Sequence, residues 1–225
     1  PSVWINAGEI PDNGIDDDGN GYIDDINGWD FANDSNMFND EALAYDEWHG
    51  THIAGIIAAS QNNGKGISGV APNAKIMVLK VFQNGIAYTS DIINAINYAK
   101  SMGAKIVNCS WGISTENIAL KEAMQQSGLL FICAAGNGNQ NTDINPVYPA
   151  SGEGDYIISV ASLNKSGNLS RFSNYGPVSV DVAAPGEDIL SAVPGDGYAE
   201  SSGTSQATAF VTGEVALLIS KYPAL

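Results

Sequence analysis

The side chains best suited to covalent catalysis lie in three short stretches of the sequence. His49 opens the stretch HGTHIAG, Asn137 ends the stretch AAGN, and Ser205 lies within SGTSQATA. Acyl transfer by a serine requires a hydroxyl nucleophile, an imidazole that takes its proton, and hydrogen-bond donors aimed at the oxyanion. The three stretches supply one candidate for each of these requirements.

Each of the three residues, taken alone, also has a simpler structural interpretation. A single histidine is usually structural, and a serine at the start of a helix is more often an N-cap than a nucleophile. The first turn of a helix does, however, leave backbone N–H groups without intrahelical partners, and these can serve a ligand. The combination of histidine, asparagine and serine in one α/β pattern is much more specific than any member by itself.

Alternating strand and helix patterns would position these residues. Helices are predicted over 49–60, 90–101, 115–127 and 204–221, and strands over 75–82, 105–110, 129–134, 156–162 and 179–183. Strands that are apolar on both faces are typical of a buried parallel sheet, so the pattern predicts an α/β fold with helices flanking a central, mostly parallel sheet. Asn137 would then lie at the carboxyl edge of the sheet, where ligands bind in such folds.

Composition excludes several classes of protein. The chain has 225 residues, 44% of them hydrophobic, which suits one globular domain. Its 9 basic and 25 acidic residues give a net charge of −16, which disfavours binding to nucleic acid or to an anionic membrane. No apolar run approaches the roughly 20 residues of a membrane span. We therefore expect no nucleic-acid or membrane partner, and we expect cations to bind instead.

The chain has only two cysteines, Cys109 and Cys133, which are too few for a disulfide scaffold. Both lie inside apolar runs, which favours an interpretation as buried free thiols. A single bridge between neighbouring strands is the alternative.

The first 48 residues differ from the rest and contain a predicted calcium loop. Their Asp, Asn and Gly content and lack of periodicity indicate an elaborated loop region. The predicted ligands follow the spacing of the first half of an EF-hand loop and are Asp16, Asp18, Asn20, Tyr22 through its carbonyl, and Asp24. The bidentate glutamate and the flanking helices of a true EF-hand are missing. A solvated acidic turn is the alternative interpretation.

These motifs resemble those of the subtilisin-like serine proteases, the subtilases. The family's HGTHVAG, GVAP, AGN and GTS motifs correspond to residues 49–55, 69–72, 135–137 and 203–205, and the resemblance runs from about Trp4 to the end. It implies a single catalytic domain over 1–225 with a subtilisin-like three-layer sandwich. Residues 1–48 would form the calcium-loop region of this domain and 49–225 its α/β core.

The resemblance also implies a role for each candidate residue in a serine endopeptidase. Ser205 would be the nucleophile, His49 rather than His52 the general base, and Asn137 the oxyanion donor. The substrate would be an extended polypeptide. One wall of its primary specificity pocket would be formed by Ser110, Trp111 and Gly112, and the opposite wall by Ala135 and Gly136.

One departure from the family concerns the triad aspartate, which ends an early strand in a Val-Ile-Asp-x-Gly setting. No such strand is found in residues 1–48, where Asp30, Asp34, Asp40 and Asp46 all lie in predicted loops. We therefore expect a core truncated at both ends, with the aspartate on a separate N-terminal segment. The alternative is a catalytically impaired peptide-binding or scaffold module.

Location is inferred indirectly. Subtilases are mostly secreted and made with an inhibitory prosegment, so the resemblance implies such a partner here as well. A calcium loop suits the millimolar calcium found outside cells. We therefore expect an extracellular, secreted protein.

Overall fold

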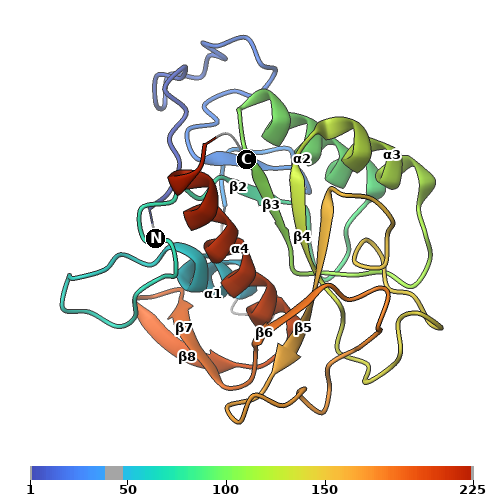
Figure 1. Cartoon of the computed structure of the whole chain (residues 1–225). Helices are drawn as coiled ribbons and strands as arrows, with labels where there is room; N and C mark the ends of the chain where they lie inside the picture. The colour runs from blue at the N-terminus through green and yellow to red at the C-terminus, as the bar shows by residue number, and fades with distance from the viewer. Residues whose placement is uncertain (1, 39–47, 224–225) are drawn as a thin grey trace.

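The computed structural model describes residues 2–38 and 48–223 and has a parallel sheet at its centre (Figure 1). Four strands form this sheet in the order β3 (Ile106–Cys109), β4 (Leu130–Ala134), β5 (Ile157–Leu163) and β6 (Val182–Pro185). All three neighbouring pairs run parallel. This arrangement confirms the predicted α/β class with a mostly parallel sheet.

Helices cover both faces of the sheet and complete three layers. One face is covered by α2 (Thr89–Ser101) and α3 (Ile118–Ser127), the other by α4 (Thr204–Lys221), behind which lies α1 (His49–Ala58). Alternate residues of β4 divide between the faces, as the two-residue period of a strand requires. Phe131 packs in the cluster that contains Met124 of α3, whereas Ile132 packs with Ala207 and Val211 of α4.

Two small sheets flank the central one. In the first, β1 (Gly28–Asp30) runs parallel to β2 (Val78–Lys80), and in the second β7 (Ile189–Val193) pairs antiparallel with β8 (Gly197–Ser201). The strand β1 lies within the region expected to be loops. Its first residue, Gly28, has a φ of 125°, and a Cβ there would lie 1.9 Å from the Val78 carbonyl oxygen. Only glycine therefore permits this pairing.

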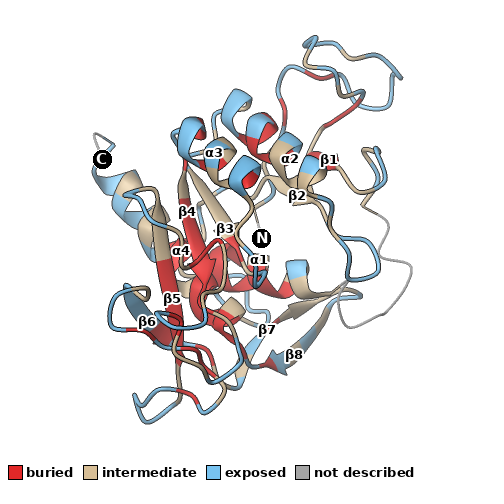
Figure 2. Ribbon diagram, turned by 90° about the vertical axis from the view of Figure 1, so that its right-hand side faces the viewer, coloured by how far each residue is buried: buried red, intermediate tan, exposed pale blue. Residues whose placement is uncertain are grey.

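A deep groove separates β2 from β3. In the part of the chain that the structure describes, β2 pairs only with β1, and β3 pairs only with β4 on the far side. Residues of both strands line the groove, whose volume is about 1330 Å³. The whole of β2 and the first three residues of β3 are only half-buried, whereas most of β4 is buried (Figure 2). The edges of the two strands are thus open to an additional segment.

The two cysteines lie opposite each other on neighbouring strands. Cys109 of β3 is in register with Cys133 of β4, and both are buried free thiols, as predicted. Burial, together with hydrogen bonding to Cys109, raises the pKa of Cys133 well above its usual range.

Candidate active site

Ser205 lies in the first turn of α4 and is tied to the residue that follows β3. Its Oγ donates a hydrogen bond to the Ser110 carbonyl oxygen at 3.2 Å, and the Ser110 hydroxyl donates to the Ser205 carbonyl oxygen at 3.1 Å. The backbone N–H of Ser205, as a first-turn group, has no intrahelical acceptor. The hydroxyl and this N–H are therefore placed together at the positive end of the helix.

Asn137 follows β4 and is held by the residue before Ser205. Its Oδ1 accepts hydrogen bonds from Thr204 N at 2.8 Å and from Thr204 Oγ1 at 2.9 Å. Because only the amide oxygen can accept the backbone N–H, these bonds fix the orientation of the amide. Its Nδ2 lies 3.4 Å from where a Cβ on Gly203 would be. An amide donor is therefore held at the start of α4, beside Ser205.

A buried asparagine that sequence reasoning missed shapes the loop that carries Asn137. Asn174 donates through Nδ2 to the Ala135 carbonyl oxygen at 2.8 Å, and its Oδ1 accepts from Gly138 N at 2.9 Å and Gln140 N at 3.1 Å. A Cβ on Gly136, whose φ is 101°, would lie 2.5 Å from Asn174 Nδ2. An isolated asparagine between two loops gives no sequence pattern, so only the tertiary structure shows this role.

The two histidines of the HGTHIAG stretch have different surroundings. His52 is fully buried, and its Nε2 lies 3.1 Å from the Ala199 carbonyl oxygen. Because a carbonyl only accepts, Nε2 carries the proton. Burial lowers the pKa of His52, which favours the neutral ring. His49 opens α1, is half-buried and lines the groove.

One groove brings the predicted catalytic side chains together. His49, Asn137 and Ser205 all line it, and Ser110 and Trp111 line it as well. The other predicted substrate-binding residues are Gly112, Gly136 and Ala135, of which Ala135 has a buried side chain and so can offer only its backbone. Segments that follow β3 and β4 and that begin α1 and α4 therefore line the same groove.

The acidic N-terminal loop gathers three carboxylates. Oxygen atoms of Glu9, Asp16 and Asp18 lie within 4.8 Å of one another. Glu9 was not expected as a ligand, because it precedes the EF-hand-like spacing. Convergent carboxylate oxygens are the donors that calcium prefers, so the chemistry of this set fits the predicted ion.

The remaining predicted ligands make other contacts. Asp24 accepts hydrogen bonds from Asn13 N at 3.1 Å and Gly14 N at 2.9 Å through its two carboxylate oxygens. The amide oxygen of Asn20 accepts from Tyr22 N at 2.8 Å. These bonds shape the loop around the three carboxylates.

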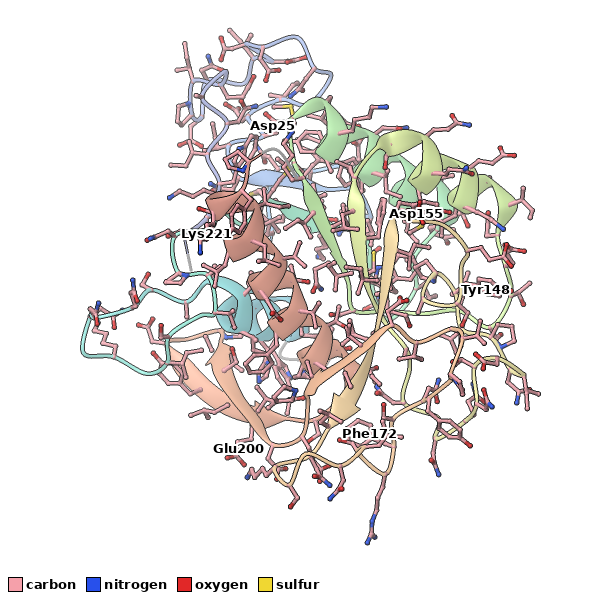
Figure 3. The ribbon with its side chains drawn as sticks, in the orientation of Figure 1. Asp25, Tyr148, Asp155, Phe172, Glu200 and Lys221 are labelled. Atoms are coloured by element: carbon pink, nitrogen blue, oxygen red, sulfur yellow. The ribbon has the colours of Figure 1, made fainter. Side chains whose placement is uncertain are left out.

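Asp25 fastens this loop to the core (Figure 3). It is fully buried and accepts hydrogen bonds from the Tyr98 hydroxyl at 2.5 Å, Asn6 Nδ2 at 2.8 Å and Asn20 Nδ2 at 2.9 Å. Burial and the bond to Asp25 raise the pKa of Tyr98. The loop therefore has a fixed position on α2, from which Tyr98 projects.

The four aspartates named in the sequence analysis as lying in predicted loops differ in their placement. Asp30 ends β1, is buried, and forms an ion pair with Lys80 at 3.1 Å. Asp34 lies in the exposed turn after β1. Asp40 and Asp46 lie outside the described residues.

Three known proteins are similar to this chain over most of its length. Thermitase from Thermoactinomyces vulgaris is 40% identical over 87% of this chain and 68% of its own length. The major intracellular serine protease of Bacillus subtilis (strain 168) is 40% identical over 86% of this chain and 61% of its own length. A thermophilic serine proteinase from Bacillus sp. (strain AK1) is 42% identical over 77% of this chain and 43% of its own length. The chain thus spans about two fifths to two thirds of these relatives.

Among the helices of residues 2–38 and 48–223, none combines the length and the apolar character needed to cross a membrane.

Solved structures agree with the fold described above. The crystal structure of a cold adapted subtilisin-like serine proteinase matches with a TM-score of 0.69 and 36% identity, covering 87% of this chain and 67% of that one. The family model described as the subtilase family matches residues 10–225. The chain therefore belongs to the subtilase family.

Proposed function

We propose that this chain is the core of a serine endopeptidase in which Ser205 attacks the peptide carbonyl. His49 takes the hydroxyl proton and later delivers it to the leaving amine. The Asn137 Nδ2 and the Ser205 N–H stabilise the oxyanion. The observation that carries the proposal is the shared groove, which is lined by all three side chains. The locked amide of Asn137 adds support, because a preorganised donor costs no reorganisation during the reaction.

The proposed substrate is an extended polypeptide that lies along residues 110–112. The bonds between Ser205 and Ser110 place this segment directly against the nucleophile. Peptide groups of the substrate would pair with its backbone, in the manner of an added strand.

The proposed source of the triad aspartate is an additional strand between β2 and β3. The sequence lacks the strand that carries this residue in the family, and the groove leaves an edge of each strand open. An extended apolar segment in this groove would bury the half-exposed residues of both strands. Its carboxyl end could then bring an acid to the base. The segment can be continuous with this chain or separate from it, as a prosegment or another N-terminal piece would be.

We further infer that calcium binds the N-terminal loop through Asp16 and Asp18, with Glu9 as an added ligand. Backbone N–H groups of the loop donate to all three carboxylates, and a divalent cation would relieve the repulsion that remains between them. Extracellular calcium is high enough for a site of modest affinity, which supports secretion. The intracellular relative shows that the lineage alone does not set the compartment.

The proposed chemistry is tested with a fluorophosphonate, a reagent that phosphonylates activated serines. We expect mass spectrometry to locate one adduct on Ser205, and Ser205→Ala to abolish it. Ser202→Ala, three residues earlier, is the matched control and should react as the unmodified chain does. Labelling elsewhere, or no labelling at high protein concentration, would contradict the nucleophile and assign the chain to the peptide-binding alternative.

A further inference from the structure

Asn108 is an amide on a face of β3 that is otherwise apolar. Alternate residues of a strand point to opposite faces of the sheet, and Ile106 packs on the side of α4, against the cluster that contains Val211. Cys109 packs on the other side, in the cluster that contains Met124 of α3. Asn108 therefore shares its face with Ile106 and is directed towards α4. A polar group at such a position needs hydrogen-bond partners, because burying it without them destabilises the fold.

Both ends of the Asn108 amide have partners. Its Oδ1 accepts a hydrogen bond from Thr212 Oγ1 at 2.8 Å, and its Nδ2 donates to Ser110 Oγ at 2.8 Å. Thr212 lies about two turns after Ser205 on α4, and its hydroxyl oxygen also lies 2.9 Å from the Thr208 carbonyl oxygen. The side chain of Asn108 thus joins the middle of α4 to the residue that follows β3.

The direction of these bonds sets the orientation of the Ser110 hydroxyl. An amide nitrogen only donates, so Asn108 Nδ2 occupies a lone pair of Ser110 Oγ and leaves the hydroxyl proton to be donated elsewhere. Ser110 Oγ donates it to the Ser205 carbonyl oxygen at 3.1 Å, and Ser205 Oγ donates in return to the Ser110 carbonyl oxygen at 3.2 Å. Two bonds therefore hold Ser205 against Ser110, and one of them depends on Asn108.

We propose that Asn108 is a positioning residue for the nucleophile, which acts through the Ser110 hydroxyl to hold the first turn of α4 at a fixed distance from the end of β3. This inference rests on the proposed function of Ser205. Without the amide donor, the Ser110 hydroxyl can turn away from the Ser205 carbonyl oxygen, and Ser205 loses one of its two bonds to Ser110. A misplacement of about 1 Å can cost on the order of 10²-fold in rate, so the loss of one bond should slow the reaction about tenfold.

Asn108→Asp removes the donor and keeps the acceptor. At neutral pH the carboxylate can still accept from Thr212, but it cannot donate to Ser110 Oγ and would attract the Ser110 hydroxyl proton towards itself. The rate is measured with a small alkyl fluorophosphonate, which does not need the peptide-binding segment. In this reaction Ser205 Oγ forms a bond to phosphorus, fluoride leaves, and the hydroxyl proton passes to His49. For the 225-residue chain, we expect Asn108→Asp to react about tenfold more slowly than the unmodified chain at a temperature at which both are folded.

A double-mutant cycle separates positioning from a general loss of stability. If Asn108 acts through the Ser110 hydroxyl, Ser110→Ala alone should slow the reaction to a similar extent. Adding Asn108→Asp to Ser110→Ala should then have little further effect, because the two residues belong to one pathway. A merely structural role would lower the melting temperature of each variant without this dependence of one rate effect on the other.

Two threonines of α4 provide a matched comparison. Thr212→Val removes the donor to Asn108 and should slow the reaction by a smaller factor than Asn108→Asp, whereas Thr212→Ser keeps the hydroxyl and should restore the rate. Thr208 lies one turn earlier and donates to the Thr204 carbonyl oxygen at 2.7 Å, which is the same kind of bond within the helix. Thr208→Val should therefore lower stability as Thr212→Val does but leave the rate unchanged.

Two results would overturn the inference while leaving the nucleophile intact. In the first, Asn108→Asp reacts within twofold of the unmodified chain. In the second, the effects of Asn108→Asp and Ser110→Ala multiply in the double variant. Should Asn108→Asp fail to fold, equal rates for Thr212→Val and Thr208→Val would overturn the inference instead. Failure of the unmodified chain to label Ser205 would refute the proposed function, and the inference about Asn108 with it.

Discussion

At the scale of single residues, the site depends on side chains whose orientation is set by neighbours. Thr204 fixes the amide of Asn137 through two hydrogen bonds, and Asn174 fixes the loop on which Asn137 lies. His52 has a buried structural position one turn after His49. The chemistry proposed for this groove therefore rests on groups that are oriented before a substrate arrives.

Removal of the amide donor should slow the reaction without preventing substrate binding. We expect Asn137→Leu to lower kcat for a peptide substrate by roughly 10²–10³, with little change in KM, because an oxyanion donor acts mainly in the transition state. Asn137→Asp keeps an acceptor for Thr204 and should preserve the melting temperature while also losing activity. A Leu variant within threefold of the unmodified chain would show that Asn137 is not the donor.

The buried His52 should make the fold sensitive to mild acid. Its pKa is lowered in the folded state, so below the ordinary value of about 6.5 the unfolded chain binds more protons. Stability should therefore fall as pH decreases from about 6.5 towards the folded-state pKa, by at most about 1.4 kcal/mol per pH unit for this group.

The measurement is urea unfolding at several pH values between 5 and 7. His52→Gln can still donate to the Ala199 carbonyl but does not titrate, so it should be less stable overall and show a shallower dependence on pH. Equal slopes for the variant and the unmodified chain would show that His52 does not cause the acid sensitivity.

At the scale of elements, the ends of parallel strands and the starts of helices create the site. The residues after β3 and β4 and the first turns of α1 and α4 supply the proposed nucleophile, base and oxyanion donors. The N-terminal loop is a second functional element, fastened to α2 through Asp25 and Tyr98. Calcium binding to this loop should therefore stabilise the packing of the loop against the core.

Calcium should raise the melting temperature. Saturating a site at about 100 times its Kd adds about 2.7 kcal/mol, which corresponds to a rise of roughly 5–10 °C for a chain of this size. Asp18→Asn should abolish the rise, and Glu9→Gln should do the same if the three carboxylates form the site. Asp24→Asn should leave the calcium-induced rise in place if Glu9, Asp16 and Asp18 form the site, and should abolish the rise if Asp24 is a ligand, as the EF-hand spacing predicts.

Differential scanning calorimetry with calcium and with a chelator provides the measurement. Asp196→Asn, in the β7–β8 turn, is the control and should retain the full calcium effect. A melting temperature that does not depend on calcium would favour the solvated acidic turn.

Sequence periodicity predicted the long elements well, because their burial follows a regular pattern. The helix predicted over 49–60 is α1 (His49–Ala58), and the strand predicted over 129–134 is β4 (Leu130–Ala134). The three-residue strand β1 and the hairpin of β7 and β8 were missed, because such short strands do not show a clear alternation of apolar and polar residues. Glu9 was missed for a different reason, because it precedes the residues that follow the EF-hand-like spacing.

At the scale of the whole molecule, the structure is a subtilisin-like sandwich whose sheet is interrupted between β2 and β3. The chain is highly acidic, with a net charge of −16, and its groove exposes apolar strand residues. Burying these residues on an added strand would stabilise the fold through the hydrophobic effect. Assembly with such a strand would then control both stability and turnover.

A strand supplied as a peptide should therefore activate the chain. We expect a peptide with an apolar strand of about 5–6 residues, a usual strand length, ending in Asp-x-Gly, to raise the melting temperature and accelerate fluorophosphonate labelling. In subtilisin, the aspartate is worth roughly four orders of magnitude in turnover, which sets the upper limit of the gain. The same peptide with Asn for Asp should stabilise the chain without comparable acceleration. Equal rates with both peptides would contradict the proposed source of the acid.

The most direct test of the proposed mechanism is a crystal structure of the chain bound to a peptidyl boronic acid, which forms a tetrahedral adduct with an activated serine. The mechanism predicts a bond from boron to Ser205 Oγ, and one boronate oxygen about 2.7–3.1 Å from Asn137 Nδ2. The His49 ring should lie within hydrogen-bonding distance of the adduct. A boronate attached elsewhere, or bound to Ser205 with its oxygens turned away from Asn137 and His49, would contradict the mechanism.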